Sequence, residues 1–153
     1  NKQIYSVMRF KKIYWNFILG LVLIALLIQA KCDNKVQNIP YVPVNFDINL
    51  NLPAYNDLNF VSNHIYVNGG SKGLIIYRYT QDIFVVLDRH STSDIELGCT
   101  VSVDDDGLLI SDHSDCSESK WLIIDGTVNQ GTAILPLHRY GASWNPPVLS
   151  IFN

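Results

Sequence analysis

The chain has 153 residues and a formal net charge of −3, which suits one domain of ordinary size. Residues 1–31 hold five basic and no acidic side chains, so the remainder holds six basic and 14 acidic side chains, a net charge of −8. An acidic domain repels nucleic-acid phosphates and anionic lipid headgroups. The charge therefore excludes nucleic acid as an expected partner.

The N-terminal part of the sequence has the pattern of a signal peptide over residues 1–31. Met8 is the expected start, because three basic residues follow it and precede an uncharged apolar run of 12 residues, Phe17 to Ile28. A helix that spans a bilayer needs about 20 apolar residues, so the run is too short to span and suits the apolar core of a signal peptide.

A cysteine, Cys32, follows this run, where a bacterial lipoprotein is cleaved and acylated. Lys31 departs from the small residue expected before the cleavage site, so an uncleaved N-terminal anchor helix stays as the alternative. The abrupt change to polar residues at 33–35 favours the lipoprotein. Acyl chains on Cys32 would bind a membrane with about 0.8 kcal/mol per buried methylene. Residues 32–43 are polar, proline-bearing and without periodicity, which indicates a tether.

Residues 44–153 consist of short β-branched and aromatic runs separated by turn residues, as is typical of antiparallel sheet. Apolar and polar residues alternate over 44–52, which predicts a half-buried strand that Pro53 ends, with a loop or short turn at 55–60. Further strands are expected at 65–67, 74–79, 83–87, 100–103, 108–110, 121–124, 127–128, 139–143 and 148–152. No window of ten residues after Cys32 has helical periodicity, so the sequence predicts an all-β domain.

The most informative stretch lies between Asp88 and Leu122. It reads Asp-Arg-His-Ser-Thr-Ser at 88–93, and Ser-Asp-Cys-Ser-Glu-Ser-Lys-Trp at 114–121, with an Asp-Gly hairpin turn between them. Asp-Gly-Thr-Val-Asn-Gln-Gly-Thr-Ala-Ile-Leu-Pro-Leu-His-Arg-Tyr follows at 125–140. These segments resemble the Rieske 2Fe-2S domain, in particular its small membrane-anchored envelope lipoprotein branch. That family has D-R-x-C-x-(H or another residue), then C-P-x-H-G-S-x-(F/W), then D-G-x-V-x-x-G-P-A-x-x-P-L-x-x-Y. The resemblance covers residues 44–153.

The resemblance implies stacked antiparallel sheets with two loops at one tip, and it places serines where the family has its cluster ligands. The four former ligand positions are Ser91, Ser93, Ser114 and Ser117. A Rieske centre needs two thiolates on one iron and two imidazoles on the other, and a neutral hydroxyl replaces neither well. The resemblance therefore implies the fold without the cofactor. Glu118 replaces the glycine of the second loop, and Asp115 and Thr132 replace prolines.

Three cysteines leave an even pair, Cys99 and Cys116, if Cys32 carries the lipid in an oxidising compartment. Membrane-bound Rieske domains use an additional disulfide to join the two cluster loops. One of its cysteines follows the first ligand pair and the other lies between the second pair. Because Cys99 and Cys116 occupy these places, the resemblance implies a disulfide between them.

Two histidines, His90 and His113, each stand one residue before a former ligand position and close to Asp112 and Asp115. Imidazole and carboxylate groups can hold zinc or another divalent ion, so these histidines are weak metal candidates. They lack tetrahedral ligand spacing, and we interpret both as exposed loop histidines. The acidic turn at 104–106 lacks the spaced ligands of a calcium loop, and no G-x-S-x-G motif supports a serine hydrolase.

Two functions are consistent with these patterns. The first is a bacterial cell-envelope lipoprotein, anchored to the membrane through Cys32, whose cluster-free Rieske-type domain is a non-enzymatic structural or binding module for an envelope protein or glycan. Trp121 and Trp144 would then contribute either to contacts or to the core. The second is a 2Fe-2S electron-transfer protein, although Cys99 and Cys116 do not stand in C-x-H and C-x-x-H pairs. The colour of the purified protein distinguishes the two.

Overall fold

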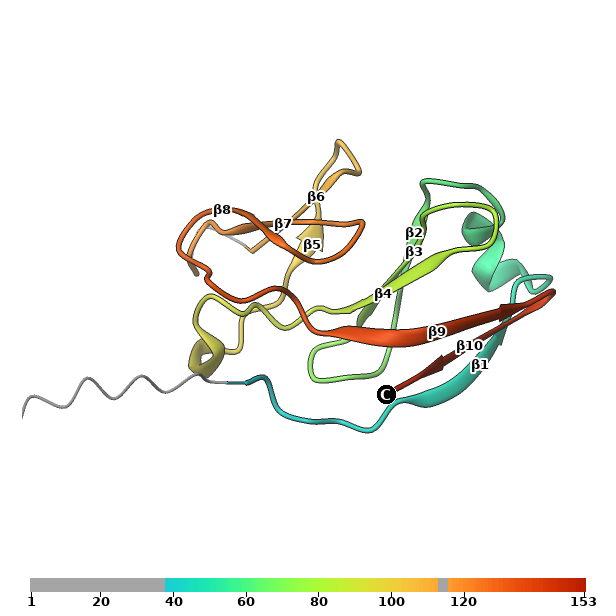
Figure 1. The fold of residues 1–153 in the computed structure, drawn as a ribbon, viewed down its shortest axis with the longest axis horizontal. Coiled ribbons are helices and arrows are strands. Elements are labelled where there is room, and N and C mark those ends of the chain that lie inside the picture. Colours follow the sequence, from blue (N-terminus) through green and yellow to red (C-terminus); the bar gives the residue numbers. More distant parts are fainter. Residues whose placement is uncertain (1–37, 113–115) are drawn as a thin grey trace, which may run out of the picture. The chain divides into compact units, whose positions relative to one another are not determined.

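The fold is known from a computed structural model that describes residues 38–112 and 116–153 (Figure 1). The expected signal peptide or anchor helix, the lipidation site Cys32 and the tether up to residue 37 lie outside the described residues. His113, Ser114 and Asp115 lie outside them as well. In the described part of the chain, no helix is long and apolar enough to cross a membrane.

Ten strands in the described residues pair into two sheets, and every pairing is antiparallel, as the sequence predicts. The larger sheet has the strand order β1–β10–β9–β4–β3–β2. Its strands are β1 (Asn45–Asn49), β2 (His64–Val67), β3 (Leu74–Arg78), β4 (Phe84–Asp88), β9 (Arg139–Asn145) and β10 (Val148–Phe152). The smaller sheet has the order β5–β6–β7–β8 and consists of β5 (Ser102–Val103), β6 (Leu109–Ser111), β7 (Lys120–Leu122) and β8 (Val128–Gln130).

The first strand follows the predicted alternation for most of its length. Val44, Ile48 and Leu50 are buried, whereas the polar residues between them face outward or lie at the margin. Leu52 is 52 % exposed because the strand has already ended at Asn49. The seven residues that follow, Pro53–Asn59, form the 3-10 helix η1 where a loop or short turn was expected. Proline suits its first turn, where backbone N–H groups have no partner within the helix.

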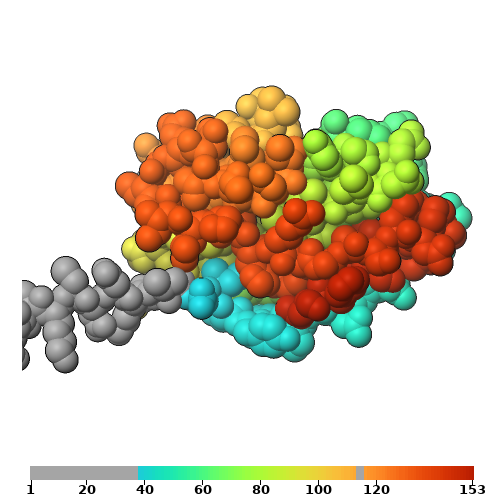
Figure 2. All heavy atoms as spheres, viewed as in Figure 1, coloured from blue at the N-terminus to red at the C-terminus, as the bar shows by residue number. Residues whose placement is uncertain are grey.

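Strands β3 and β4 are buried on both faces, which explains their continuous apolar sequences. Ile76 and Val86 face one core together with residues of β1, β9 and β10. Ile75 and Leu87 face a second core, which contains Ile110 and Trp121 of the smaller sheet among its buried side chains. Figure 2 shows the yellow and orange residues of the smaller sheet next to the green strands. Trp121 is fully buried, so it belongs to this core and not to a contact surface.

Candidate functional site

Two loops carry the serines that the sequence analysis selected. The first loop connects β4 to β5 and includes the short 3-10 helix η2 (Ile95–Leu97), and the second connects β6 to β7. The Cys99–Cys116 disulfide joins them, with a Cα–Cα distance of 6.4 Å, and confirms the predicted pairing. The loops are therefore held together covalently at the end of the smaller sheet.

The centre of this site is the carboxylate of Asp112, which is only 4 % exposed. Its Oδ2 atom accepts hydrogen bonds from three hydroxyls, those of Ser91 at 2.8 Å, Ser93 at 2.9 Å and Ser117 at 2.7 Å. Its Oδ1 atom accepts one from the backbone N–H of Ser119 at 2.7 Å. We call these five residues the Asp112 cluster. These four hydrogen bonds replace the hydrogen bonds to water that the carboxylate loses on burial.

Three of the four former ligand positions thus converge on one atom. Ser91 and Ser93 come from the first loop and Ser117 comes from the second, whereas Ser114 lies outside the described residues. Only the resemblance predicts that these serines lie together. The sequence marks Asp112 only as a neighbour of His113, because nothing in the local pattern indicates that an aspartate one residue after β6 is buried between two loops.

Ser119 connects the Asp112 cluster to a third segment, the loop after β8. Its hydroxyl oxygen accepts hydrogen bonds from the backbone N–H groups of Thr132 at 3.1 Å and Ala133 at 3.0 Å. Gly131 approaches so closely that a Cβ atom there would lie 2.5 Å from the Ser119 Cα atom, and its φ is +96°. Only glycine fits this position without displacing Ser119. The cluster is therefore enclosed by three loops.

A second buried carboxylate, Asp88 at the end of β4, has its own set of donors. Its oxygens accept hydrogen bonds from the backbone N–H groups of Ser71 at 2.7 Å, Lys72 at 3.3 Å and His90 at 2.8 Å, and from the Tyr140 hydroxyl at 2.8 Å. We call this set the Asp88 cluster. Burial raises the pKa of Tyr140 above its usual value, and the hydrogen bond to Asp88 raises it further. The tyrosine hydroxyl is thereby kept protonated as a donor.

The interpretation of His90 as an exposed loop histidine is wrong, because its side chain is 3 % exposed. Its Nδ1 atom lies 2.7 Å from the Ser71 hydroxyl, and its Nε2 atom lies 3.1 Å from the carbonyl oxygen of Ile95. Both ring nitrogens are engaged within the fold, so neither is free for a metal ion. Within residues 38–112 and 116–153, no three His, Cys, Asp or Glu side chains form a metal-binding group.

The Ser71–His90 contact brings a hydroxyl and an imidazole together, as an activated serine requires. Acyl transfer requires free donors for the developing oxyanion. The backbone N–H groups of Ser71 and Lys72 both donate to Asp88, so neither is free for this purpose. Ser91 has a different environment, fully buried beside a carboxylate, and its hydroxyl donates to Asp112. Both serines therefore have structural roles in these clusters.

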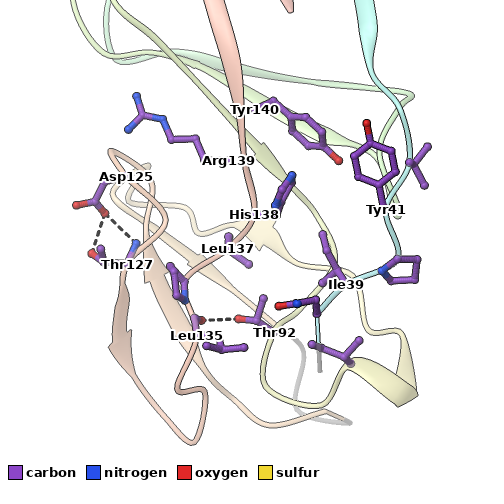
Figure 3. Close-up of a pocket in the computed structure, with 15 residues that line it drawn as sticks. Ile39, Tyr41, Thr92, Asp125, Thr127, Leu135, Leu137, His138, Arg139 and Tyr140 are labelled. Carbon is purple, nitrogen blue, oxygen red and sulfur yellow. Dashed lines mark hydrogen bonds between the residues drawn. The ribbon is translucent and has the colours of Figure 1, made fainter. Parts of the chain in front are cut away.

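A groove of about 760 Å³ lies on the same unit of the protein, residues 37–153 (Figure 3). One wall is the extended segment before β1, which includes Ile39 and Tyr41, and the other is the segment that leads into β9. Figure 3 shows Tyr41 opposite Tyr140, with His138 on the same wall as Tyr140. No local sequence pattern predicts this groove, because its two walls are almost 100 residues apart in the chain.

The volume of the groove falls in the range of ligand-binding pockets, about 300–1,000 Å³. In the two carboxylate clusters, by contrast, every donor named above is engaged in a hydrogen bond.

No model of a known protein family matches the chain, and no curated protein matches its sequence.

Proposed function

We propose that this chain is a bacterial cell-envelope lipoprotein whose Rieske-type domain holds no iron–sulfur cluster and serves as a structural or binding module. The observation that carries the proposal is the convergence of Ser91, Ser93 and Ser117 on Asp112. Residues that are distant in sequence meet where the resemblance places the cluster ligands. They offer hydroxyls and a carboxylate there.

The backbone of the second loop also supports this proposal. Glu118 has a φ of +54°, the left-handed conformation that glycine adopts without strain. Its position is the one at which the family pattern has glycine. The Cys99–Cys116 disulfide joins the two loops in the way the resemblance implies. The loop scaffold is thus consistent with a Rieske-type tip whose ligands have been replaced.

The residues of the Asp112 cluster do not fit a 2Fe-2S cluster. Such a centre is held by deprotonated thiolates and neutral imidazoles, and the two described cysteines near the site are consumed in a disulfide. The serine hydroxyls are directed at Asp112, which already occupies the space between the loops. We derive no electron-transfer step from this set of side chains.

Iron content tests the cluster-free state. The full chain, produced in cells that assemble iron–sulfur clusters, should contain no stoichiometric iron and show no visible chromophore. The matched variant restores the ligands with Ser91→Cys, Ser93→His, Ser114→Cys and Ser117→His, replaces Asp112→Ala to empty the centre, and adds Glu118→Gly. Iron uptake is expected only in this variant. Stoichiometric iron with a rhombic electron paramagnetic resonance signal in the unmodified protein would overturn the proposal and favour electron transfer.

Lipidation is a separate part of the proposal and rests on the sequence around Cys32. Cells grown with labelled fatty acid should incorporate the label into the unmodified protein and not into Cys32→Ser. Cys99→Ser serves as the matched control, because Cys99 is engaged in the disulfide and should not affect labelling. Equal labelling of the Cys32→Ser protein would contradict the lipoprotein assignment.

A further inference from the structure

Two neighbouring turns lie at one end of the larger sheet. The first turn, residues 60–63, follows η1, and the second, residues 79–83, connects β3 to β4. The turns lie side by side, because the Ser62 N–H donates to the Arg78 carbonyl at 2.8 Å and the Arg78 N–H donates to the Asn63 carbonyl at 2.9 Å. Figure 1 shows them as the green and yellow-green turns next to η1.

Four large apolar side chains of these turns are exposed. In the first turn, Phe60 is 60 % and Val61 is 42 % exposed. In the second turn, Tyr79 is 44 % and Ile83 is 47 % exposed. We call these four residues the turn patch, and none of them lines the groove of Figure 3. Apolar side chains that gather on a surface mark interaction sites, whereas single exposed ones are ordinary.

The buried side chain of Arg78 holds the two turns in fixed positions. Its guanidinium donates to the Leu58 carbonyl of η1 at 2.8 Å, to the Thr80 carbonyl of the second turn at 3.3 Å and to the Gln81 carbonyl. Within the second turn, the Thr80 hydroxyl oxygen accepts a hydrogen bond from the Ile83 N–H at 3.1 Å. A surface that is already ordered loses less conformational entropy when it binds a partner.

The charged side chains at the edge of the turn patch are acidic. Asp57 borders the first turn, because the Phe60 N–H donates to its carbonyl at 3.2 Å, and Asp82 lies in the second turn. Both aspartates are exposed, and neither makes an ion pair with another described residue. The cations Lys72 and Arg89 lie beyond the opposite ends of β3 and β4. An approaching surface therefore meets apolar side chains beside negative charges.

This charge distribution distinguishes the surfaces that can cover the turn patch. An anionic membrane surface would be repelled by Asp57 and Asp82. A second copy of the chain would bring the same two carboxylates against them in a symmetric contact. A protein face with basic residues around an apolar centre would be attracted instead. Protein interfaces have this arrangement of an apolar centre within a polar rim.

We propose that the turn patch binds a partner protein through a face whose apolar centre is surrounded by lysine or arginine side chains. The apolar centre would pack on the turn patch, and the basic side chains would lie opposite Asp57 and Asp82. A specific interface buries about 800 Å² on each partner, so the turn patch supplies its centre and the surrounding polar surface supplies its rim. This inference rests on the binding-module function proposed above and names the chemistry of the partner.

The test uses the full chain and the peptide acetyl-Leu-Lys-Lys-Leu-Leu-Lys-Lys-Leu-Lys-Lys-Leu-Leu-Lys-Lys-amide, whose leucines have the spacing of one helix face. Binding should saturate, and NMR should show the largest shift changes at the amides of Val61, Tyr79 and Ile83. Leu108 is the internal control, because it is 64 % exposed and follows the acidic turn at 104–106. The matched peptide with glutamate in place of lysine should bind about tenfold more weakly, because like charges repel.

Variants of the protein separate the apolar and the charged contributions. Ile83→Ser removes an apolar contact and should weaken binding of the lysine peptide by about tenfold. Asp82→Lys replaces an attractive charge with a repulsive one, so it should weaken binding of the lysine peptide by about tenfold and strengthen binding of the glutamate peptide. Leu108→Ser should retain the affinity within about twofold. All three positions are exposed, and a thermal melt of each variant checks that the domain stays folded.

Three results would overturn the inference outright. The lysine peptide does not bind, its shift changes at Leu108 equal those in the turn patch, or the glutamate peptide binds equally well. Two further results would overturn it by assigning another occupant. Shift changes at Val61 and Ile83 that grow with protein concentration alone would indicate a second copy of the chain. Broadening of these signals by phosphatidylcholine bicelles with a nitroxide-labelled lipid, with Leu108 unchanged, would indicate a bilayer.

The inference and the proposed function fail separately. Stoichiometric iron, or equal fatty-acid labelling of Cys32→Ser, would overturn the proposed function and leave the peptide results unaffected. Peptide binding at the groove or at the Asp112 cluster in place of the turn patch would overturn the inference and retain a binding module.

Discussion

The two buried carboxylates, Asp88 and Asp112, each accept four hydrogen bonds, but they obtain them from different sources. Three of the four donors to Asp88 are backbone N–H groups. Three of the four donors to Asp112 are serine hydroxyls from two loops that a disulfide joins. Backbone donors cannot turn away without a change in the chain path, whereas hydroxyls can rotate to other partners.

We infer from this difference that Asp88 maintains the fold, whereas Asp112 occupies the centre of a site between two loops. Asp88 fixes the turn before β3 and the Tyr140 hydroxyl of β9 to the end of β4, and all three strands belong to the larger sheet. Asp112 holds loop side chains whose hydroxyls also contact one another, Ser91 with Ser93 at 2.9 Å and Ser117 with Ser119 at 2.7 Å. Substitutions in the two clusters should therefore have unequal effects.

The largest effect is expected for Asp88→Ala. It leaves the buried N–H of His90, the part-buried N–H groups of Ser71 and Lys72 and the Tyr140 hydroxyl without their acceptor. The free energy of unfolding should fall by about 4 kcal/mol. Tyr140→Phe removes only one donor and should cost about 1 kcal/mol. Chemical denaturation measures both. A loss for Asp88→Ala that is no greater than that of Tyr140→Phe would remove the structural role assigned to the Asp88 cluster.

The next effect concerns the disulfide. It joins residues 17 apart in sequence, and a closed loop of that size contributes about 3 kcal/mol by restricting the unfolded chain. Replacing both cysteines, Cys99→Ser with Cys116→Ser, should lower the melting temperature. Hydrogen exchange should accelerate at the Ser91 and Ser119 amides in the loops and stay unchanged at the Ser71 amide. Free thiols in the oxidised native protein would contradict the pairing itself.

The Asp112→Ala substitution should cost less, about 2 kcal/mol, because the serine hydroxyls retain one another as partners. The Ser119 N–H is buried and cannot rotate, and it keeps only a longer hydrogen bond, 3.3 Å, to the Ser117 hydroxyl oxygen. Ser93→Ala, at a partly exposed position, should cost under about 1 kcal/mol. Chemical denaturation under the same conditions compares the free energies of unfolding of four variants, Asp88→Ala, Tyr140→Phe, Asp112→Ala and Ser93→Ala. An Asp112→Ala loss as large as that of Asp88→Ala would show that both carboxylates maintain the fold.

The sequence predicted the parts of this structure that follow from local patterns. The alternation at 44–50 and the apolar runs of β3 and β4 locate their strands, because burial of one or both faces imposes these patterns. The disulfide and the grouping of the serines followed from the resemblance and not from the residues themselves. The burial of His90 was missed because its partner, Ser71, lies 19 residues earlier.

The groove was missed for a related reason. Its walls are the segment before β1 and the segment that leads into β9, which are almost 100 residues apart in the chain. Neither Tyr41 nor His138 stands in a sequence pattern that indicates a groove. Which segments lie side by side depends on long-range strand pairing, and local patterns in a single sequence do not indicate that pairing.

The smallest expected effect concerns backbone strain at two positions, one in the second loop and one before β2 of the larger sheet. Glu118 in the second loop and Ser62 before β2 are the described non-glycine residues with positive φ, +54° and +68°. The left-handed conformation costs a residue with a Cβ atom about 1–2 kcal/mol, and the greater freedom of glycine in the unfolded chain returns part of that cost. Glu118→Gly and Ser62→Gly should each stabilise the domain by about 0.5–1 kcal/mol, and Glu118→Asn should give an intermediate gain because asparagine tolerates this conformation. A loss of stability in Glu118→Gly, with a gain in Ser62→Gly, would show that the Glu118 side chain makes a contact that outweighs the strain of the loop.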